Sequence, residues 1–174
     1  IVGLQVPATW MTRPGDLDSI AETLAVCADA DRPVLVHPGP AQPSDNIPDW
    51  WPAVVDYTAQ LQAAWWAWRA VGRHTVPGLR ICFVAGAGLA PALHERFVAR
   101  SGQPFVVHPN DYVETSSCGR QGVDALVRAL GIDAVVLGTD RPYAEPAEFH
   151  LGAAATHAIT ITNPARLLGR HTLE

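Results

Sequence analysis

The stretch 33-PVLVHPGP-40 is an apolar run that ends at a histidine and passes directly into a turn with two prolines and a glycine. Short, nearly continuous apolar runs of this kind are typical of strands that are covered on both faces. Comparable runs occur at 1-IVGLQV-6, 80-RICFVAG-86, within 104–116, and at 134-AVVLG-138. The sequence therefore predicts five buried strands.

Segments with helical spacing of apolar residues separate these runs. One begins after Asp16, an expected N-cap, and a longer one runs from about 49 to 72. The motif 163-NPARLLG-169, with Asn163 as N-cap and a proline at the first helical position, predicts a short last helix. Strands that alternate with helices predict a parallel sheet in a single α/β domain over 1–174, either doubly wound or part of a (β/α) barrel.

Composition excludes several classes of function. The chain has 174 residues, a net charge of −5 and no lysine, so it offers no basic stripe for nucleic acid. No apolar run approaches the ~18 residues of a membrane helix, and no signal peptide pattern opens the chain, so we expect a cytoplasmic protein without a membrane partner. Cys27, Cys82 and Cys118 are odd in number and outside any CxxC pair, which predicts core thiols. Because Ile1 already lies in a strand-like run without a methionine, we expect the true start upstream.

Polar residues that close the apolar runs are the candidates for a site, because ligands bind at the carboxyl ends of parallel strands. His37 and Asp140 each follow such a run, and an imidazole and a carboxylate are common ligands of Zn²⁺ and related ions. Two structural alternatives remain open: His37 could bond a loop carbonyl, and Asp140 could cap the turn 140-DRPY-143. Glu114 could be a further ligand, although an exposed loop carboxylate is the favoured interpretation.

Five motifs together resemble one known family, the amidohydrolase-2 proteins, over essentially the whole chain. They are 33-PVLVHPGP-40, 83-FVAGAGLAPALHERF-97, 111-DYVETSS-117, 131-GIDAVVLGTDRPY-143 and 163-NPARLLG-169. The block 138-GTDRP-142 is the most specific of them. These proteins are metal-dependent hydrolases and decarboxylases with a barrel fold, and this chain is similar to their C-terminal two thirds.

The resemblance implies a (β/α)₈ barrel of the TIM type, of which this chain covers strands four to eight, with strands one to three upstream. His37 corresponds to the family's strand-five metal ligand. Asp140 corresponds to its strand-eight carboxylate, which touches the metal and takes a proton from the attacking water. The implied cofactor is one divalent ion, zinc or alternatively manganese.

Two departures from the family pattern bear on activity. The family's His-x-His pair on the first strand has no counterpart in this chain, and would lie upstream. Ala85 stands where the sixth strand carries a histidine, and a methyl group neither binds a metal nor moves a proton. A half barrel would also leave open edges, so we expect the missing strands in the natural protein or in a second chain, with a homo-oligomer as the expected assembly.

Substrate contacts are expected near the strand mouths. Five tryptophans cluster in the predicted long helix: Trp50, Trp51, Trp65, Trp66 and Trp68. Their favoured role is packing on the barrel or on a partner subunit, although Trp50 or Trp51, at the start of the helix, could line a pocket. Arg141 could bind a substrate carboxylate, or hold Asp140 or a loop. Gly86-x-Gly88 resembles part of a dinucleotide fingerprint, but Pro91 at the third small position argues against it.

The expected function is therefore a metal-dependent hydrolase that acts on a small carboxylated, lactone or ring substrate through metal-activated water. The alternatives are a non-oxidative decarboxylase of the same family, or a catalytically degenerate barrel that serves as an interaction or regulatory subunit.

Overall fold

The computed structural model describes residues 1–41, 45–146 and 150–170 and contains one parallel sheet of five strands. The strands confirm all five predicted runs, and their bounds are β1 Leu4–Pro7, β2 Val34–His37, β3 Ile81–Phe83, β4 Asp111–Glu114 and β5 Val135–Val136. Their order in the sheet is β1-β2-β3-β4-β5, and every neighbouring pair is parallel. A doubly wound sheet reverses its strand order at a switch point, whereas a barrel keeps it sequential. Of the two predicted folds, the sequential strand order therefore excludes the doubly wound sheet and shows part of a (β/α) barrel.

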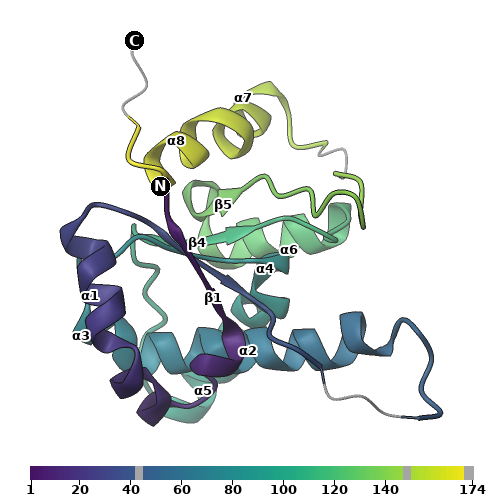
Figure 1. The fold of residues 1–174 in the computed structure, drawn as a ribbon. Helices are drawn as coiled ribbons and strands as arrows, with labels where there is room; N and C mark the ends of the chain where they lie inside the picture. Colours follow the sequence, from purple (N-terminus) through teal and green to yellow (C-terminus); the bar gives the residue numbers. More distant parts are fainter. Residues whose placement is uncertain (42–44, 147–149, 171–174) are drawn as a thin grey trace.

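Helical segments connect successive strands (Figure 1). The α-helices are α1 Ala21–Asp29, α2 Tyr57–Ala67, α3 Arg73–Thr75, α4 Ala85–Gly88, α5 His94–Ser101, α6 Arg120–Leu130, α7 Ala153–His157 and α8 Asn163–Leu167. The 3-10 turns are η1 Ala8–Trp10, η2 Pro14–Ser19, η5 Ala90–Leu93 and η6 Ile132–Ala134, and the π turns are η3 Pro52–Asp56, η4 Trp68–Gly72 and η7 Ala158–Thr162. Helical structure is continuous from 51 to 75, which confirms the predicted long helix.

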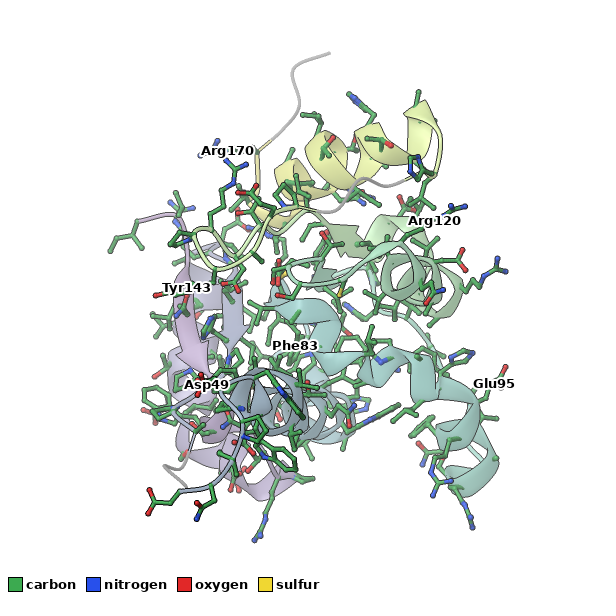
Figure 2. The ribbon with its side chains drawn as sticks, turned by 90° about the vertical axis from the view of Figure 1, so that its right-hand side faces the viewer. Asp49, Phe83, Glu95, Arg120, Tyr143 and Arg170 are labelled. Carbon is green, nitrogen blue, oxygen red and sulfur yellow. The ribbon has the colours of Figure 1, made fainter. Side chains whose placement is uncertain are left out.

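The outer face of the sheet forms the main core. One residue from each strand lies in a single row across this face, and all five are at most 1% exposed: Val6, Val36, Phe83, Val113 and Val135. Trp65 of α2 packs edge-on against Phe83, with ring centroids 5.2 Å apart. Phe83 accordingly lies near the centre of the molecule in Figure 2. Burial of these side chains is the main force that holds the helices to the sheet.

The inner face is covered at one end by the C-terminal helix. Leu167 of α8 packs with Cys82, Tyr112 and Val136, which all belong to the inner face, and these four side chains form a second buried cluster. The Nε atom of Arg80, just before β3, donates to the Leu167 carbonyl at 2.8 Å. The segment 163-NPARLLG-169 therefore closes the inner face from the side of the strands' amino ends.

Asp111 anchors the long helix to the amino end of β4. Its carboxylate is 1% exposed and accepts the indole N–H of Trp68 at 2.9 Å. Arg73 forms an ion pair with the same oxygen, and Arg69 Nη1 lies 3.8 Å from the other oxygen. A buried carboxylate thus has two cations and one neutral donor around it, as a buried charge requires.

Three details differ from the expectations. Helix α1 begins at Ala21, so Asp16 is not its N-cap; the Asp16 carboxylate instead accepts the Arg13 N–H at 2.9 Å within η2. Asn163 lies inside a continuous helical segment, and its amide donates to the carbonyls of Ile132 and Val135 at 2.8 and 2.7 Å. The first turns of the long helix project beyond the sheet in Figure 1, so their apolar side chains are not part of the core.

Candidate functional site

His37 ends β2 on the inner face of the sheet, level with Pro7 of β1. Its side chain is exposed, and Nδ1 lies 2.9 Å from the carbonyl oxygen of Pro38. A carbonyl can only accept, so Nδ1 must donate, and the neutral ring then presents Nε2 as an acceptor. The expected bond to a loop carbonyl is therefore present. Histidines that bind metals commonly donate their other ring nitrogen in the same way.

Asp140 follows β5 by four residues and is exposed. Its φ of 52° lies in the left-handed region, which is uncommon for a residue other than glycine. Its main-chain carbonyl accepts the N–H groups of Tyr143 and Ala144 at 2.8 and 3.1 Å, so it is the backbone that closes the predicted turn. Within the described residues no hydrogen bond or ion pair engages the Asp140 carboxylate, which is available for a ligand.

The two candidate metal ligands lie at the same edge of the sheet but not on neighbouring strands. β3 and β4 separate β2 from β5, so a shared ligand would have to reach across the inner face. Asp49, in the loop after β2, and Tyr143, in the turn after Asp140, lie on the same side of the molecule in Figure 2. Over the part of the chain that the structure describes, no group of three or more His, Cys, Asp or Glu side chains is gathered closely enough to hold a metal ion.

The prediction that Glu114 is an exposed loop residue was wrong. It lies on β4, is 7% exposed, and is therefore a buried strand residue rather than an exposed loop carboxylate. Its carboxylate accepts the backbone N–H groups of Ala85 and Ser116 and the hydroxyl of Ser116. The reason for the error is that these donors converge only when β3 and β4 lie side by side.

Ala85 opens a short left-handed turn. Every residue from Ala85 to Leu89 has a φ between 47° and 61°. A left-handed conformation costs ~1–2 kcal/mol for each residue other than glycine, so this turn needs support from its surroundings. Gly88 lies in close contact with the backbone of Thr58 on α2, and Gln62 Nε2 donates to its carbonyl at 2.8 Å. The turn is also unlike a dinucleotide-binding loop, in which the glycines lead directly into a right-handed helix.

Among the residues that the structure describes, no hydrogen bond, ion pair or ring contact joins the predicted substrate-binding residues Trp50 and Trp51 to Arg141. Trp50 and Trp51 are 56% and 37% exposed, with ring centroids 5.8 Å apart, at the projecting start of the long helix. Arg141 pairs with Glu145 at 2.8 Å, and both side chains are largely exposed. Of the roles open to Arg141, the structure therefore shows the one that holds a loop.

A hollow that the sequence did not indicate follows β1. It has a volume of about 800 Å³ and is lined by residues between Thr9 and Ile20, among them Trp10 and Arg13. At one end Thr9 packs against Gly39, two residues after His37. The signal that could have found it is the run 9-TWMTRPGD-16, which places an aromatic ring and a cation directly after a strand.

Two thiols near the site are held protonated. Burial raises the pKa of Cys118 to about 11, and the neighbouring Glu114 carboxylate adds to the rise. Burial also raises the pKa of Cys82, again with a smaller contribution from Glu114. The structure thus confirms Cys82 and Cys27 as buried core thiols and places Cys118 at intermediate depth. None of the three is poised to act as a thiolate at neutral pH.

Residues 1–170 match the family model described as Amidohydrolase. No curated protein matches the sequence. The fold is similar to that of IDCase from Metarhizium anisopliae, with 18% identity and a TM-score of 0.75 over 96% of this chain and 56% of that chain. A putative amidohydrolase from Staphylococcus aureus has 18% identity and a TM-score of 0.69, over 95% of this chain and 63% of that one. A 5-carboxyvanillate decarboxylase from Novosphingobium aromaticivorans, solved with manganese, has 15% identity and a TM-score of 0.73, over 97% and 57%.

At these identities the likeness to solved structures is one of fold. The chain spans 56% to 63% of the length of these three proteins. Such partial cover agrees with a sheet that contains five parallel strands in sequential order. The family match covers nearly the whole chain. The chain therefore belongs to the amidohydrolase family and has the α/β fold of part of a TIM barrel.

Proposed function

We propose that this chain carries part of the active site of a metal-dependent decarboxylase that acts on a small carboxylated ring compound. The observation that supports a metal site is the placement of His37 and Asp140 at the carboxyl edge of one sheet, with Nδ1 of His37 held by the Pro38 carbonyl. Decarboxylation is favoured over hydrolysis because the solved proteins of similar fold include decarboxylases, some of them with bound manganese. This is the alternative that the sequence raised, in place of its first expectation.

The residues present fit a metal only as part of a ligand set. An imidazole nitrogen and a carboxylate suit zinc or manganese, but two donors do not complete a coordination shell. His37 and Asp140 would hold the ion, and the remaining donors would come from residues outside those that the structure describes. When bound, the divalent ion supplies Lewis acidity and orients the carboxylated substrate.

Asp140 is the residue we assign to proton transfer. In decarboxylation the bond between the ring carbon and the carboxylate breaks, carbon dioxide leaves, and a proton takes its place on the carbon. The Asp140 side chain is exposed and has no partner among the described residues, so it can take a proton from water and, in its protonated form, pass that proton to the ring carbon. The Pro38 carbonyl keeps the His37 ring in one tautomer and one orientation during this step.

Two other functions are candidates for the same site. Hydrolysis of a lactone or another small carboxylated or ring compound would use Asp140 as the base that activates water. A non-catalytic barrel is favoured by one observation, the methyl group of Ala85 where an acid or base is expected. A cytoplasmic location and a homo-oligomer, or a second chain that completes the sheet, stay predictions.

The deciding experiment measures metal content and carbon dioxide release on the full-length protein. We expect close to one manganese or zinc ion per chain, which the pair His37→Ala and Asp140→Asn removes. Matched control variants are His157→Ala and Asp124→Asn, which alter the same residue types elsewhere and should retain the metal. Hydroxylated benzoates that release carbon dioxide only with the metal-loaded parent would support decarboxylation, and cleavage of lactones alone would support hydrolysis. A parent protein that binds no manganese or zinc would refute both enzymatic proposals.

A further inference from the structure

Glu114 has more contacts at the carboxyl edge of the sheet than either predicted ligand. Its buried carboxylate accepts two backbone N–H groups and one hydroxyl, from Ala85 and Ser116. Hydrogen bonds to an ionised acceptor are worth about 1.5–3 kcal/mol each, roughly twice those between neutral groups. One side chain thus joins the end of β3 to the end of β4.

The same carboxylate sets the path of the chain after β5. A β-carbon built on Gly138 would overlap Oε2 of Glu114 and come within 3.1 Å of the Ser116 nitrogen, so only glycine fits there. Next to it, Thr115 Oγ1 accepts the Gly138 N–H at 3.2 Å, and the Thr115 N–H donates to Val136 at 3.1 Å. Gly138 is the first residue of 138-GTD-140, so the backbone that leads to Asp140 packs against Glu114 and is hydrogen-bonded to Thr115.

The contact with Ala85 has a similar effect on β3. The Ala85 N–H is the first donor of the left-handed turn from 85 to 89, and the turn's own hydrogen bonds begin only at the Ala87 N–H, which donates to Val84. Glu114 therefore supplies the acceptor that a helical N-terminus lacks, in a turn of the opposite hand. Without it, a part-buried N–H next to strained backbone would lose its acceptor, at a cost of up to about 1–3 kcal/mol.

We propose that Glu114 is the positioning residue of this site: its carboxylate fixes the ends of β3, β4 and β5 relative to one another and thereby aims Asp140. The inference rests on the proposed metal site, because Asp140 is one of its two proposed ligands. Glu114 does not itself bind the ion or move a proton. Its oxygens accept hydrogen bonds from Ala85 and Ser116, and Oε2 lies against the backbone of Gly138.

The test compares manganese affinity in three single variants of the full-length protein. Glu114→Gln keeps the shape but replaces one oxygen by an NH₂ group, which must face an N–H or O–H donor. We expect its manganese dissociation constant to rise about 10-fold or more, as for loss of other outer-shell partners of metal ligands. Glu95→Gln is the matched control, because Glu95 lies on α5 at the opposite side of Figure 2 from the site, and it should change the constant less than about 2-fold.

Gly138→Ala provides the second variant, since it leaves Glu114 intact and displaces the segment that leads to Asp140. It should also weaken manganese binding about 10-fold, and by less when combined with Glu114→Gln, because neighbouring substitutions are not additive. Circular dichroism shows which variants are folded. If Glu114→Gln does not fold, the manganese affinity of Gly138→Ala alone tests the positioning role. Parental affinity in the folded variants would overturn the positioning role and leave the proposed function standing. A parent that binds no manganese would instead refute the proposed function, and the positioning role with it.

Discussion

Removal of the Asp111 carboxylate is the perturbation whose effect on stability the structure defines most sharply. Asp111 is 1% exposed, forms an ion pair with Arg73, accepts the Trp68 N–H at 2.9 Å, and lies 3.8 Å from Arg69. In Asp111→Ala two guanidinium groups that are 14% and 10% exposed lose their carboxylate. Burial already lowers the pKa of Arg69, and Asp111 counters that effect. The Asp111 carboxylate therefore stabilises the charged form of Arg69.

The expected loss of stability follows from the burial of this cluster. Breaking a buried ion pair by removing one partner costs ~3–5 kcal/mol, and the unpaired Trp68 N–H contributes within that range. A whole domain is stable by only ~5–15 kcal/mol, so Asp111→Ala should remove about a fifth or more of the total. For a chain of this length each kcal/mol corresponds to ~2–4 °C, so the melting temperature should fall by roughly 6–20 °C.

The assay is urea unfolding of the parent and of two variants, followed by circular dichroism. Asp124→Ala is the matched control, because Asp124 pairs with Arg128 at 2.8 Å on the surface of α6, with 50% and 77% of the two side chains exposed. Exposed pairs of this kind contribute below about 0.5 kcal/mol. If Asp111→Ala lowered the free energy of unfolding by less than about 1 kcal/mol, the burial argument would be wrong.

Three further predictions concern a thiol and an amide. Because the pKa of Cys118 is raised to about 11, iodoacetamide at pH 8 should modify it about 100-fold more slowly than a thiol of pKa 9.0, as mass spectrometry of labelled peptides would show; rapid labelling of the folded protein would contradict this. The pKa of Cys118 is higher in the folded than in the unfolded protein, so the stability linked to this thiol is present below about pH 9 and lost as the pH rises towards 11. The urea midpoint of the parent should therefore fall over this pH range. Cys118→Ala should reduce that fall. Asn163→Ala leaves the carbonyls of Ile132 and Val135 without their amide donor and should cost about 2–3 kcal/mol in the same assay. Asn163→Asp, which keeps the shape but not the donors, should cost as much, and a neutral effect of both would show that these bonds are not needed.

The sequence by itself determined the elements and the candidate ligands. Continuous apolar runs predicted all five strands, and helical spacing over 49–72 predicted the long helix, which is continuous from 51 to 75. His37 and Asp140 were found because a polar residue that closes a buried strand is visible as a break in the pattern. These features are local, since burial of a strand or a helix face imposes its period on neighbouring residues.

Only the tertiary structure decided what the polar groups contact. The sequential strand order excluded a doubly wound sheet, and it placed two strands between His37 and Asp140. Glu114 was expected in an exposed loop, yet it is buried by donors from Ala85 and Ser116, and the need for glycine at position 138 follows from that same carboxylate. Ala85, which follows β3, and Gly138, which follows β5, both contact Glu114 and lie more than 20 residues away from it in sequence. The period of a strand records which face is buried, but not which distant groups meet there once the strands are paired.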